Sequence, residues 1–237
     1  MPISLQDQVA LVVGASSGMG RETAILLAGE GVKVMASARR SDRLAELRGG
    51  HGIEIYPADA TDAVQMDALA AATLAKFGRL DMLVYATGTN TPDRALTRLT
   101  PAIWDMMLAV NLNGAYYATQ AVLPAMRARK AGLIFYISSR SAVAADESGA
   151  AYQAAKRGLA GLAGAVRVEE KENGIRTCVV CPGLTDTEIM EKRLVKPSAE
   201  TLAKALRPED IAEVVVGIAR LPERAWVPEV HLFPTYL

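Results

Sequence analysis

Tyr152 and Lys156 have the residue types and the spacing of an acid/base pair. They lie four residues apart, and within a helix such residues share one face. A neighbouring ammonium group favours the phenolate and lowers the pKa of a phenol towards the working pH. A surface pair at this spacing is the alternative, but of the seven tyrosines only Tyr152 has Lys four residues later. We therefore expect Tyr152 to act as a general acid/base.

A glycine-rich turn occupies residues 14–20, with the sequence Gly-Ala-Ser-Ser-Gly-Met-Gly. Glycines permit a tight turn and let the backbone approach a pyrophosphate, while the N-terminus of a following helix offers free N–H groups. An ordinary turn between a strand and a helix has a similar composition. The position after the first strand of an alternating pattern favours dinucleotide binding.

The elements that must position these groups alternate between short apolar runs and longer amphipathic ones. Strands are predicted at Val9–Val13, Val32–Ala38, Ile53–Pro57, Met82–Tyr85, Leu133–Ser138, Arg176–Cys181 and Trp226–Phe233, and helices near 19–29, 62–77, 101–128, 149–172 and 208–219. Continuous apolar strands separated by helices predict a doubly wound parallel sheet covered on both faces. We expect one α/β domain over residues 1–237, of about seven strands.

The spacing Gly-x-x-x-Gly-x-Gly, with Tyr152-x-x-x-Lys156 further on, resembles the short-chain dehydrogenase/reductase family, which has a Rossmann fold. The resemblance runs from about Val9 to Phe233. It implies that Ser139 steadies a carbonyl oxygen, with Ser138 one residue too early for that role. It further implies that the main-chain carbonyl of Asn111 holds a water that relays protons from Lys156, and that Lys156 also binds the nicotinamide ribose. Asn111, Ser139, Tyr152 and Lys156 are thus the expected catalytic residues, with no metal.

The end of the second predicted strand favours NADP(H) over NAD(H). The family's NAD-dependent members carry Asp where this chain has Ala38, and Arg39 and Arg40 follow. A guanidinium can hold a 2′-phosphate through charge-assisted contacts, and the Ser37 hydroxyl can add to them. The alternative is that both arginines lie on an exposed, solvated turn.

The remaining cofactor contacts are implied by the resemblance. Asp59 matches an acid that contacts the adenine amino group, although it could also cap the helix that begins at Asp62. Thr187, in the segment after the sixth strand, is positioned for the nicotinamide carboxamide. The expected cofactor-binding residues are Gly14, Ser16, Ser17, Gly18, Met19, Gly20, Ser37, Arg39, Arg40, Asp59, Ala60, Ala86, Gly88, Tyr152, Lys156, Pro182, Gly183, Thr185 and Thr187.

Two departures from the family pattern are visible. Val13 stands where the family usually has Thr, and Tyr85-Ala86-Thr87-Gly88 replaces an Asn-Asn-Ala-Gly turn. In the family, that Thr and an Asn of the turn form a polar contact. Because both are absent here, we expect an apolar contact between Val13 and Tyr85 or Ala86 to replace it. Arg140 follows the expected catalytic serine, where it either recognises an anionic substrate or lies in solvent near Asp146 or Glu147.

The segment 184–206 is long for a strand-to-helix connection. Apolar residues recur along it at helical spacing: Leu184, Ile189, Met190, Leu194, Val195 and Leu202. A plain pair of surface helices would show the same pattern. We expect it to be a lid over a substrate with a hydrophobic body, because such a segment lies at the carboxyl edge of the sheet.

Composition limits the remaining possibilities. Hydrophobic residues make up 51% of the chain, and 26 Lys and Arg balance 26 Asp and Glu, so neither nucleic acid nor an anionic membrane is an expected partner. No signal-like start or membrane-length apolar run is present, and a cytoplasmic protein is expected. Cys178 and Cys181 fall within a predicted strand and so point to opposite faces, and with only His51 and His231 as histidines a metal site is not expected.

The expected function is NADP(H)-dependent hydride transfer between nicotinamide and a carbonyl or alcohol substrate. A 3-oxoacyl-thioester (acyl carrier protein) reductase is the competitor within this class, and a non-catalytic NADP-binding sensor is the alternative outside it. The helices near 101–128 and 149–172 resemble those that the family packs into dimers and tetramers. Small residues permit close helix approach, although they also suit packing on the protein's own sheet. We expect a homodimer or homotetramer.

Overall fold

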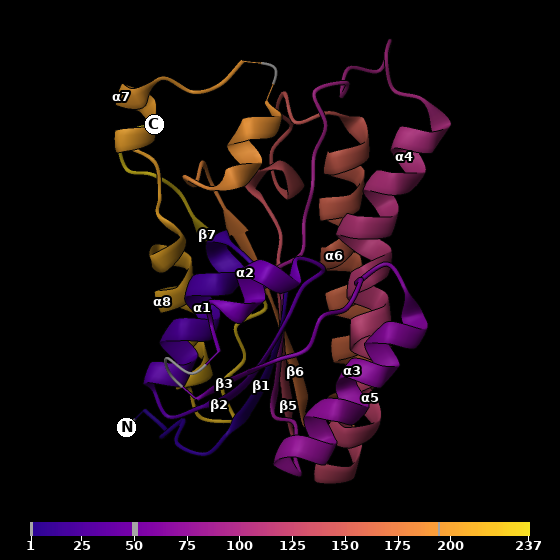
Figure 1. The fold of residues 1–237 in the computed structure, drawn as a ribbon, viewed down its shortest axis with the longest axis vertical. Helices are drawn as coiled ribbons and strands as arrows, with labels where there is room; N and C mark the ends of the chain where they lie inside the picture. The colour runs from indigo at the N-terminus through magenta and orange to yellow at the C-terminus, as the bar shows by residue number, and fades with distance from the viewer. Residues whose placement is uncertain (1, 49–51, 194) are drawn as a thin grey trace.

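Seven parallel strands form one twisted sheet in the order β3-β2-β1-β4-β5-β6-β7 (Figure 1). The computed structural model describes residues 2–48, 52–193 and 195–237. The strands are β1 (Val9–Val13), β2 (Lys33–Ser37), β3 (Ile53–Ile55), β4 (Met82–Tyr85), β5 (Gly132–Ile137), β6 (Ile175–Pro182) and β7 (Glu229–Leu232). Every residue of β1, β4 and β5 is buried, which is why these strands read as continuous apolar runs.

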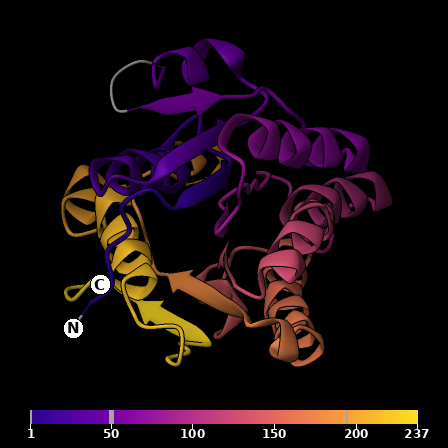
Figure 2. The same ribbon diagram turned by 90° about the horizontal axis from the view of Figure 1, so that it is seen from below.

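Helices cover both faces of the sheet, as Figures 1 and 2 show from two directions. The α-helices are α1 (Gly18–Gly29), α2 (Ser41–Ala45), α3 (Ala63–Phe77), α4 (Pro101–Leu108), α5 (Gly114–Arg129), α6 (Ala150–Glu169), α7 (Ala199–Ala203) and α8 (Pro208–Ala219). On one face, Leu27 of α1 and Val215 of α8 share a core with Val12. On the other, Val122 of α5 and Leu159 of α6 share a second core with Leu11. The expected doubly wound α/β fold is confirmed.

The predicted element bounds need several corrections. The last strand begins at Glu229 rather than Trp226, and the Trp226 indole donates a hydrogen bond to the Thr177 carbonyl (2.8 Å). Helix α2 was not expected from the sequence; its five residues are too few to show helical periodicity. The second strand is shorter than predicted at both ends and the third ends at Ile55.

The helix predicted over 101–128 is interrupted by one π-helical segment, Ala109–Asn113, between α4 and α5. The Tyr85 hydroxyl donates to the Val110 carbonyl within it (2.7 Å). A π turn holds an extra residue and thereby reorients the side chains near it. Asn111 lies at the middle of this segment, so the irregularity coincides with an expected catalytic position.

Val13 and Tyr85 are neighbours across the β1–β4 pair. They are register partners, and both side chains belong to the core cluster on the α5–α6 face. The apolar contact expected from the sequence is therefore present, between Val13 and Tyr85 rather than Ala86.

Val13→Thr is expected to destabilise the protein by about 1–3 kcal/mol, because it buries a hydroxyl where Val13 is only 1% exposed. Denaturant unfolding of the two proteins under matched conditions measures this difference. An unchanged or higher midpoint for the variant would contradict the account of this contact.

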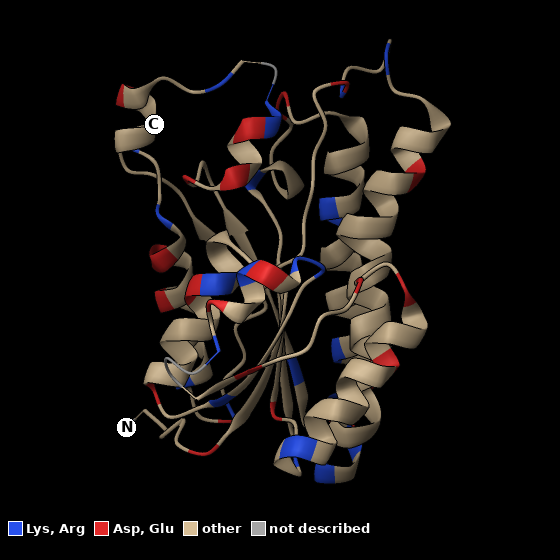
Figure 3. Cartoon of the chain, viewed as in Figure 1, with Lys and Arg blue, Asp and Glu red and all other residues tan. Residues whose placement is uncertain are grey.

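The loops that follow the carboxyl ends of the strands meet at one edge of the sheet. The strand order reverses between β1 and β4, the position where ligands bind in open α/β sheets. Lys and Arg are interspersed with Asp and Glu across the helices on both sides (Figure 3). Within the described ranges, no helix has the length and apolar character needed to cross a membrane.

Candidate active site

A pocket of about 610 Å3 opens at the carboxyl edge of the sheet. Ser139 and Tyr152 line it, as does the segment from Pro182 to Thr187. The volume is within the range of small-molecule sites. The structure thus brings Ser139, Tyr152 and the expected nicotinamide-binding segment to one cavity.

Several residues of the segment 184–206 line this pocket, and the role of the segment as a lid stays a prediction. The segment contains a 3₁₀ segment, Glu188–Lys192, and the short helix α7, and a bridge between Thr185 and Leu206 joins its two ends. Ile189 and Met190 line the pocket, and Val195 does so while remaining 80% exposed. Leu194, which was part of the expected apolar face, lies outside the described residues.

Tyr152 lies in the first turn of α6, beside Ser139 at the end of β5. Burial raises the pKa of Tyr152 to about 12, and a hydrogen bond with Ser139 opposes this rise. The Ser139 hydroxyl also donates to Ser141 Oγ (3.1 Å) and accepts from the Ser141 amide (3.1 Å), which fixes its position. Ser138 also lines the pocket, but its hydroxyl donates to the Lys156 carbonyl (2.9 Å).

Lys156 is buried one turn further along α6. Its Nζ donates to the Ile137 carbonyl (2.9 Å) and lies 5.8 Å from the centre of the Tyr152 ring. Burial lowers the pKa of Lys156 to about 8. The pKa of Tyr152 is thus raised rather than lowered as expected, because the phenol is buried, and the Lys156 ammonium donates to a carbonyl instead.

Asn111 and Lys156 meet at Gly88. A Cβ on Gly88 would lie 3.3 Å from both Asn111 Oδ1 and Lys156 Nζ. The Asn111 amide donates to the Thr89 and Met107 carbonyls (3.1 and 2.9 Å), and Oδ1 accepts from the Thr89 amide (3.0 Å). Asn111 therefore ties the π segment to the loop after β4, close to the Lys156 ammonium.

The depressed pKa of Lys156 predicts a pH-dependent stability. Between about pH 8 and the ordinary lysine pKa the unfolded chain binds more protons, so stability should rise with pH. Relative to Lys156→Met, the wild type should gain up to about 1.4 kcal/mol per pH unit in this window. Denaturant unfolding of both proteins at several pH values measures the difference, and parallel pH profiles would contradict the assignment.

The glycine-rich turn leads into α1 as expected for a phosphate site. Gly14 has a φ of +98°, and a Cβ on Gly20 would lie 2.4 Å from the Gly14 carbonyl oxygen. The N-cap Ser17 makes no side-chain cap bond, and the first turn of α1 holds no acid. A Cβ on Gly18 would lie 3.2 Å from Thr187 Cγ2, so the two segments expected to bind opposite parts of a dinucleotide lie close together.

Arg40, rather than Arg39, reaches this turn. Its guanidinium donates to Ser16 Oγ (3.0 Å) and Ser17 Oγ (2.6 Å), and it pairs with Glu188 (2.8 Å). Arg39 is 69% exposed and lies 3.7 Å from Asp59. Arg43, which the sequence reading missed, also pairs with Glu188 and lines a second pocket of about 400 Å3 beside the turn. Its only sequence signal is the spacing of three residues from Arg40.

Ser37 and Asp59 have different surroundings in the structure. Ser37 is fully buried, its hydroxyl has no partner among the described residues, and its carbonyl accepts from the Gly14 amide (2.8 Å), so its contact with a phosphate stays a prediction. Asp62, not Asp59, caps α3, by accepting from the Val64 and Gln65 amides. Asp59 Oδ1 accepts from the Thr61 amide and hydroxyl (2.9 and 2.8 Å), and Ala60 beside it is buried.

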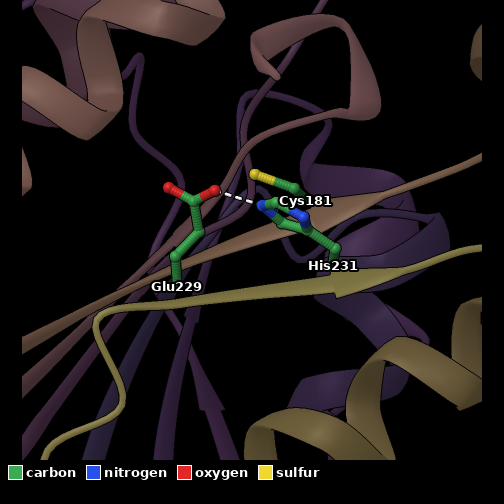
Figure 4. A group of neighbouring side chains, drawn as sticks. All are labelled: Cys181, Glu229 and His231. Atoms are coloured by element: carbon green, nitrogen blue, oxygen red, sulfur yellow. Dashed lines mark hydrogen bonds and ion pairs between the residues drawn. The ribbon is translucent and has the colours of Figure 1, made fainter. Parts of the chain in front are cut away.

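The two cysteines are both free and lie on opposite faces of β6, as expected. Cys181 does approach Glu229 and His231 of β7, and one potential ligand atom from each lies within 4.8 Å of the others (Figure 4). Burial raises the pKa of Cys181 to about 11, which favours the thiol over the thiolate that binds metals. His51 lies outside the described residues.

Comparisons with known proteins agree with this geometry. The family model for short chain dehydrogenase matches residues 8–197. A 3-oxoacyl-[acyl-carrier-protein] reductase of Synechocystis sp. is 33% identical over 233 residues, covering 94% of each chain. A closed form of serine dehydrogenase complexed with NADP+ is 27% identical, with a TM-score of 0.87 over 95% of this chain and 94% of the other. A metagenomic short-chain oxidoreductase in complex with NADP is 33% identical, with a TM-score of 0.84 over 99% and 100%. The chain belongs to the short-chain dehydrogenase family of oxidoreductases.

Proposed function

We propose that the protein is an NADP(H)-dependent oxidoreductase that interconverts a carbonyl compound and its alcohol. The convergence of Tyr152, Ser139, Lys156 and Asn111 at the carboxyl edge of the sheet carries this proposal. The tight turn at residues 14–20 leads into the same edge. It requires glycine, because a Cβ at Gly20 would lie 2.4 Å from the Gly14 carbonyl oxygen, and such a turn lets the backbone approach the pyrophosphate of a dinucleotide. When bound, the nicotinamide would supply or accept the hydride.

The proposed roles follow from the environment of each side chain. A phenol whose pKa is raised to about 12 stays protonated, so Tyr152 can donate a proton to the carbonyl oxygen during reduction. The Ser139 hydroxyl, fixed by Ser141, stabilises the negative charge that develops on that oxygen. The main-chain carbonyl of Asn111 would hold a water that relays protons from Lys156. Lys156 would also contact the nicotinamide ribose.

Two arginines support the preference for NADP(H). Arg40 and Arg43 extend from the end of β2 and from α2 to the edge of the glycine-rich turn, where no acid replaces Ala38. Their partner is Glu188 of the lid segment, and a 2′-phosphate would compete with this carboxylate for the guanidinium groups. The two structural relatives described above were solved with NADP+ or NADP. The rest of the dinucleotide would lie along the loops after β3, β4 and β6, which hold Ala60, Ala86, Gly88, Pro182, Gly183, Thr185 and Thr187.

Arg40→Gln is expected to raise the Kd for NADPH by about tenfold or more, the loss of one charge-assisted contact. The Kd for NADH should change much less, because NADH lacks the 2′-phosphate. Fluorescence titration of each cofactor against wild type and variant measures both values. An equal loss for NADH would mean that Arg40 supports the turn rather than the phosphate.

A panel of ketones, aldehydes and 3-oxoacyl thioesters, each with NADPH or NADH, tests the proposed reaction. The expected result is loss of the reduced-nicotinamide absorbance with NADPH and at least one carbonyl compound. The similarity to the Synechocystis reductase makes 3-oxoacyl thioesters the second candidate substrate class. Tight NADPH binding without turnover of any panel member would favour the non-catalytic sensor.

We also propose a homodimer or homotetramer formed through α6. Ala155 and Ala163 of this helix pack on its own sheet, whereas Gly161 and Gly164 face open space and Val168 is 77% exposed. Small residues at the surface of a long helix permit a second helix to approach closely. Light scattering of the purified protein measures the assembly, and a monomer at micromolar concentration would contradict this proposal.

A further inference from the structure

Four arginines and two acids line the large pocket, and not every arginine forms an ion pair. The six residues are Arg94, Arg98, Arg140, Arg193, Asp146 and Glu147. Arg98 pairs with Asp93 (3.6 Å), and Arg140 lies close enough to Asp146 to lower the pKa of its carboxyl group. Arg94, Arg140 and Arg193 form no ion pair within 4.0 Å in the described part of the chain, and of these three Arg94 and Arg193 are the ones whose charges lower the pKa of Tyr152. These two guanidinium groups are therefore available to a ligand.

Arg94 is held in place by contacts on two sides. Its guanidinium donates to the Lys192 carbonyl (3.2 Å), the residue just before Arg193 in the lid segment. Its backbone packs against Gly149 at the start of α6, where a Cβ would lie 2.7 Å from the Arg94 carbonyl oxygen. Arg94 thus joins the lid to the helix that carries Tyr152.

The two arginines and the Tyr152 phenol line the same pocket. Burial, and then the charge of Arg193, lowers the pKa of Arg94, while Asp146 and Glu147 oppose this shift. Both arginines act on Tyr152 in the same sense, towards a lower pKa. Two like charges held together beside a catalytic group cost free energy unless an anion lies between them. A planar carboxylate matches the donor geometry of guanidinium groups.

We infer that Arg94 and Arg193 form a subsite for a substrate carboxylate, so that the carbonyl compounds reduced are oxo acids and the alcohols oxidised are hydroxy acids. This inference rests on the proposed function and names its substrate class. A carboxylate suits the pocket better than a phosphate, because Asp146 and Glu147 on the same lining repel a dianion more than a monoanion. In the reduction, the carbonyl carbon receives a hydride from C4 of the reduced nicotinamide and the oxygen receives a proton from Tyr152. The products are the hydroxy acid and the oxidised cofactor, and the carboxylate is unchanged.

Matched pairs of substrates test the subsite: 2-oxobutanoate against its methyl ester, and 3-oxobutanoate against its methyl ester, each with NADPH. We expect wild type to prefer an acid over its ester. Arg94→Gln and Arg193→Gln should each lower kcat/KM for that acid by about ten- to a hundredfold, the loss of a charge-assisted hydrogen bond, and change the ester value far less. Arg98→Gln removes the same charge from the same pocket but from a paired residue, and it should leave the acid-to-ester ratio as in wild type.

Calorimetry on the enzyme with NADP+ separates this inference from the proposed function, since it needs no turnover. Butanoate should bind to wild type more tightly than butanamide, and Arg94→Gln should abolish the difference. Equal binding of butanoate and butanamide would overturn the subsite even if carbonyl turnover is found. So would equal use of acid and ester, a preference for 3-oxoacyl thioesters over the free acids, or tighter binding of inorganic phosphate than of butanoate.

Discussion

Tyr152→Phe is expected to lower kcat by about a hundred- to ten-thousandfold, the usual contribution of a positioned general acid. The substitution removes the phenolic proton of Tyr152 beside Ser139 in the pocket and leaves the aromatic ring. The Kd for NADPH should stay close to that of wild type, because Lys156 and the glycine-rich turn are unchanged. Steady-state turnover with the active panel compound and a fluorescence titration of NADPH measure both quantities.

Tyr116→Phe is the matched control for this substitution. Tyr116 lies in α5 and is 46% exposed, so loss of its hydroxyl should change neither kcat nor cofactor binding. Retained turnover in Tyr152→Phe would show that another group supplies the proton. Loss of NADPH binding together with turnover would show that the phenol serves the cofactor site rather than the proton transfer.

Gly20→Ala is expected to destabilise the protein and weaken NADPH binding together. The new Cβ would lie 2.4 Å from the Gly14 carbonyl oxygen and 3.0 Å from Ala86 Cβ, so the turn has to move. Overpacking of this kind costs about 1–3 kcal/mol, which corresponds to a fall in Tm of about 2–12 °C for a chain of this size. Thermal unfolding with and without NADPH measures both effects.

Gly29→Ala is the control within the same helix. A Cβ at Gly29 meets no atom within 4 Å, and alanine favours a helix over glycine by about 0.5–1 kcal/mol. The Tm should therefore rise slightly and NADPH binding should not change. Similar behaviour of the two variants would mean that the close approach of Gly20 to Gly14 has no special role.

The order of the elements could be predicted from the sequence because the signals for strands and for helices are both local. Val9–Val13 and Met82–Tyr85 were predicted with the bounds that the structure has, since a strand buried on both faces is apolar throughout. The helices that begin at Pro101 and Pro208 could also be predicted, because proline favours the first helical position. Tyr152 and Lys156 needed only helical spacing to be placed together.

The features that were missed depend on contacts between distant parts of the chain. The π segment at Asn111 is stabilised by Thr89 and Tyr85, and nothing in residues 109–113 themselves departs from an ordinary helical pattern. The pairing of Arg40 and Arg43 with Glu188 joins residues about 145 positions apart. The burial of Tyr152 and Lys156, which raises the pKa of the phenol and lowers that of the ammonium, is likewise a property of the packed sheet and helices.

Transfer of deuterium from NADPH labelled at C4 tests the central claim most directly. The wild-type enzyme is incubated with NADPH deuterated on each face of C4 in turn and with the carbonyl compound that the panel identifies, and the product is examined by mass spectrometry. Hydride transfer predicts that one of the two labelled cofactors, and not the other, delivers a deuterium to the carbinol carbon. A product without deuterium from either cofactor would contradict the proposed reaction.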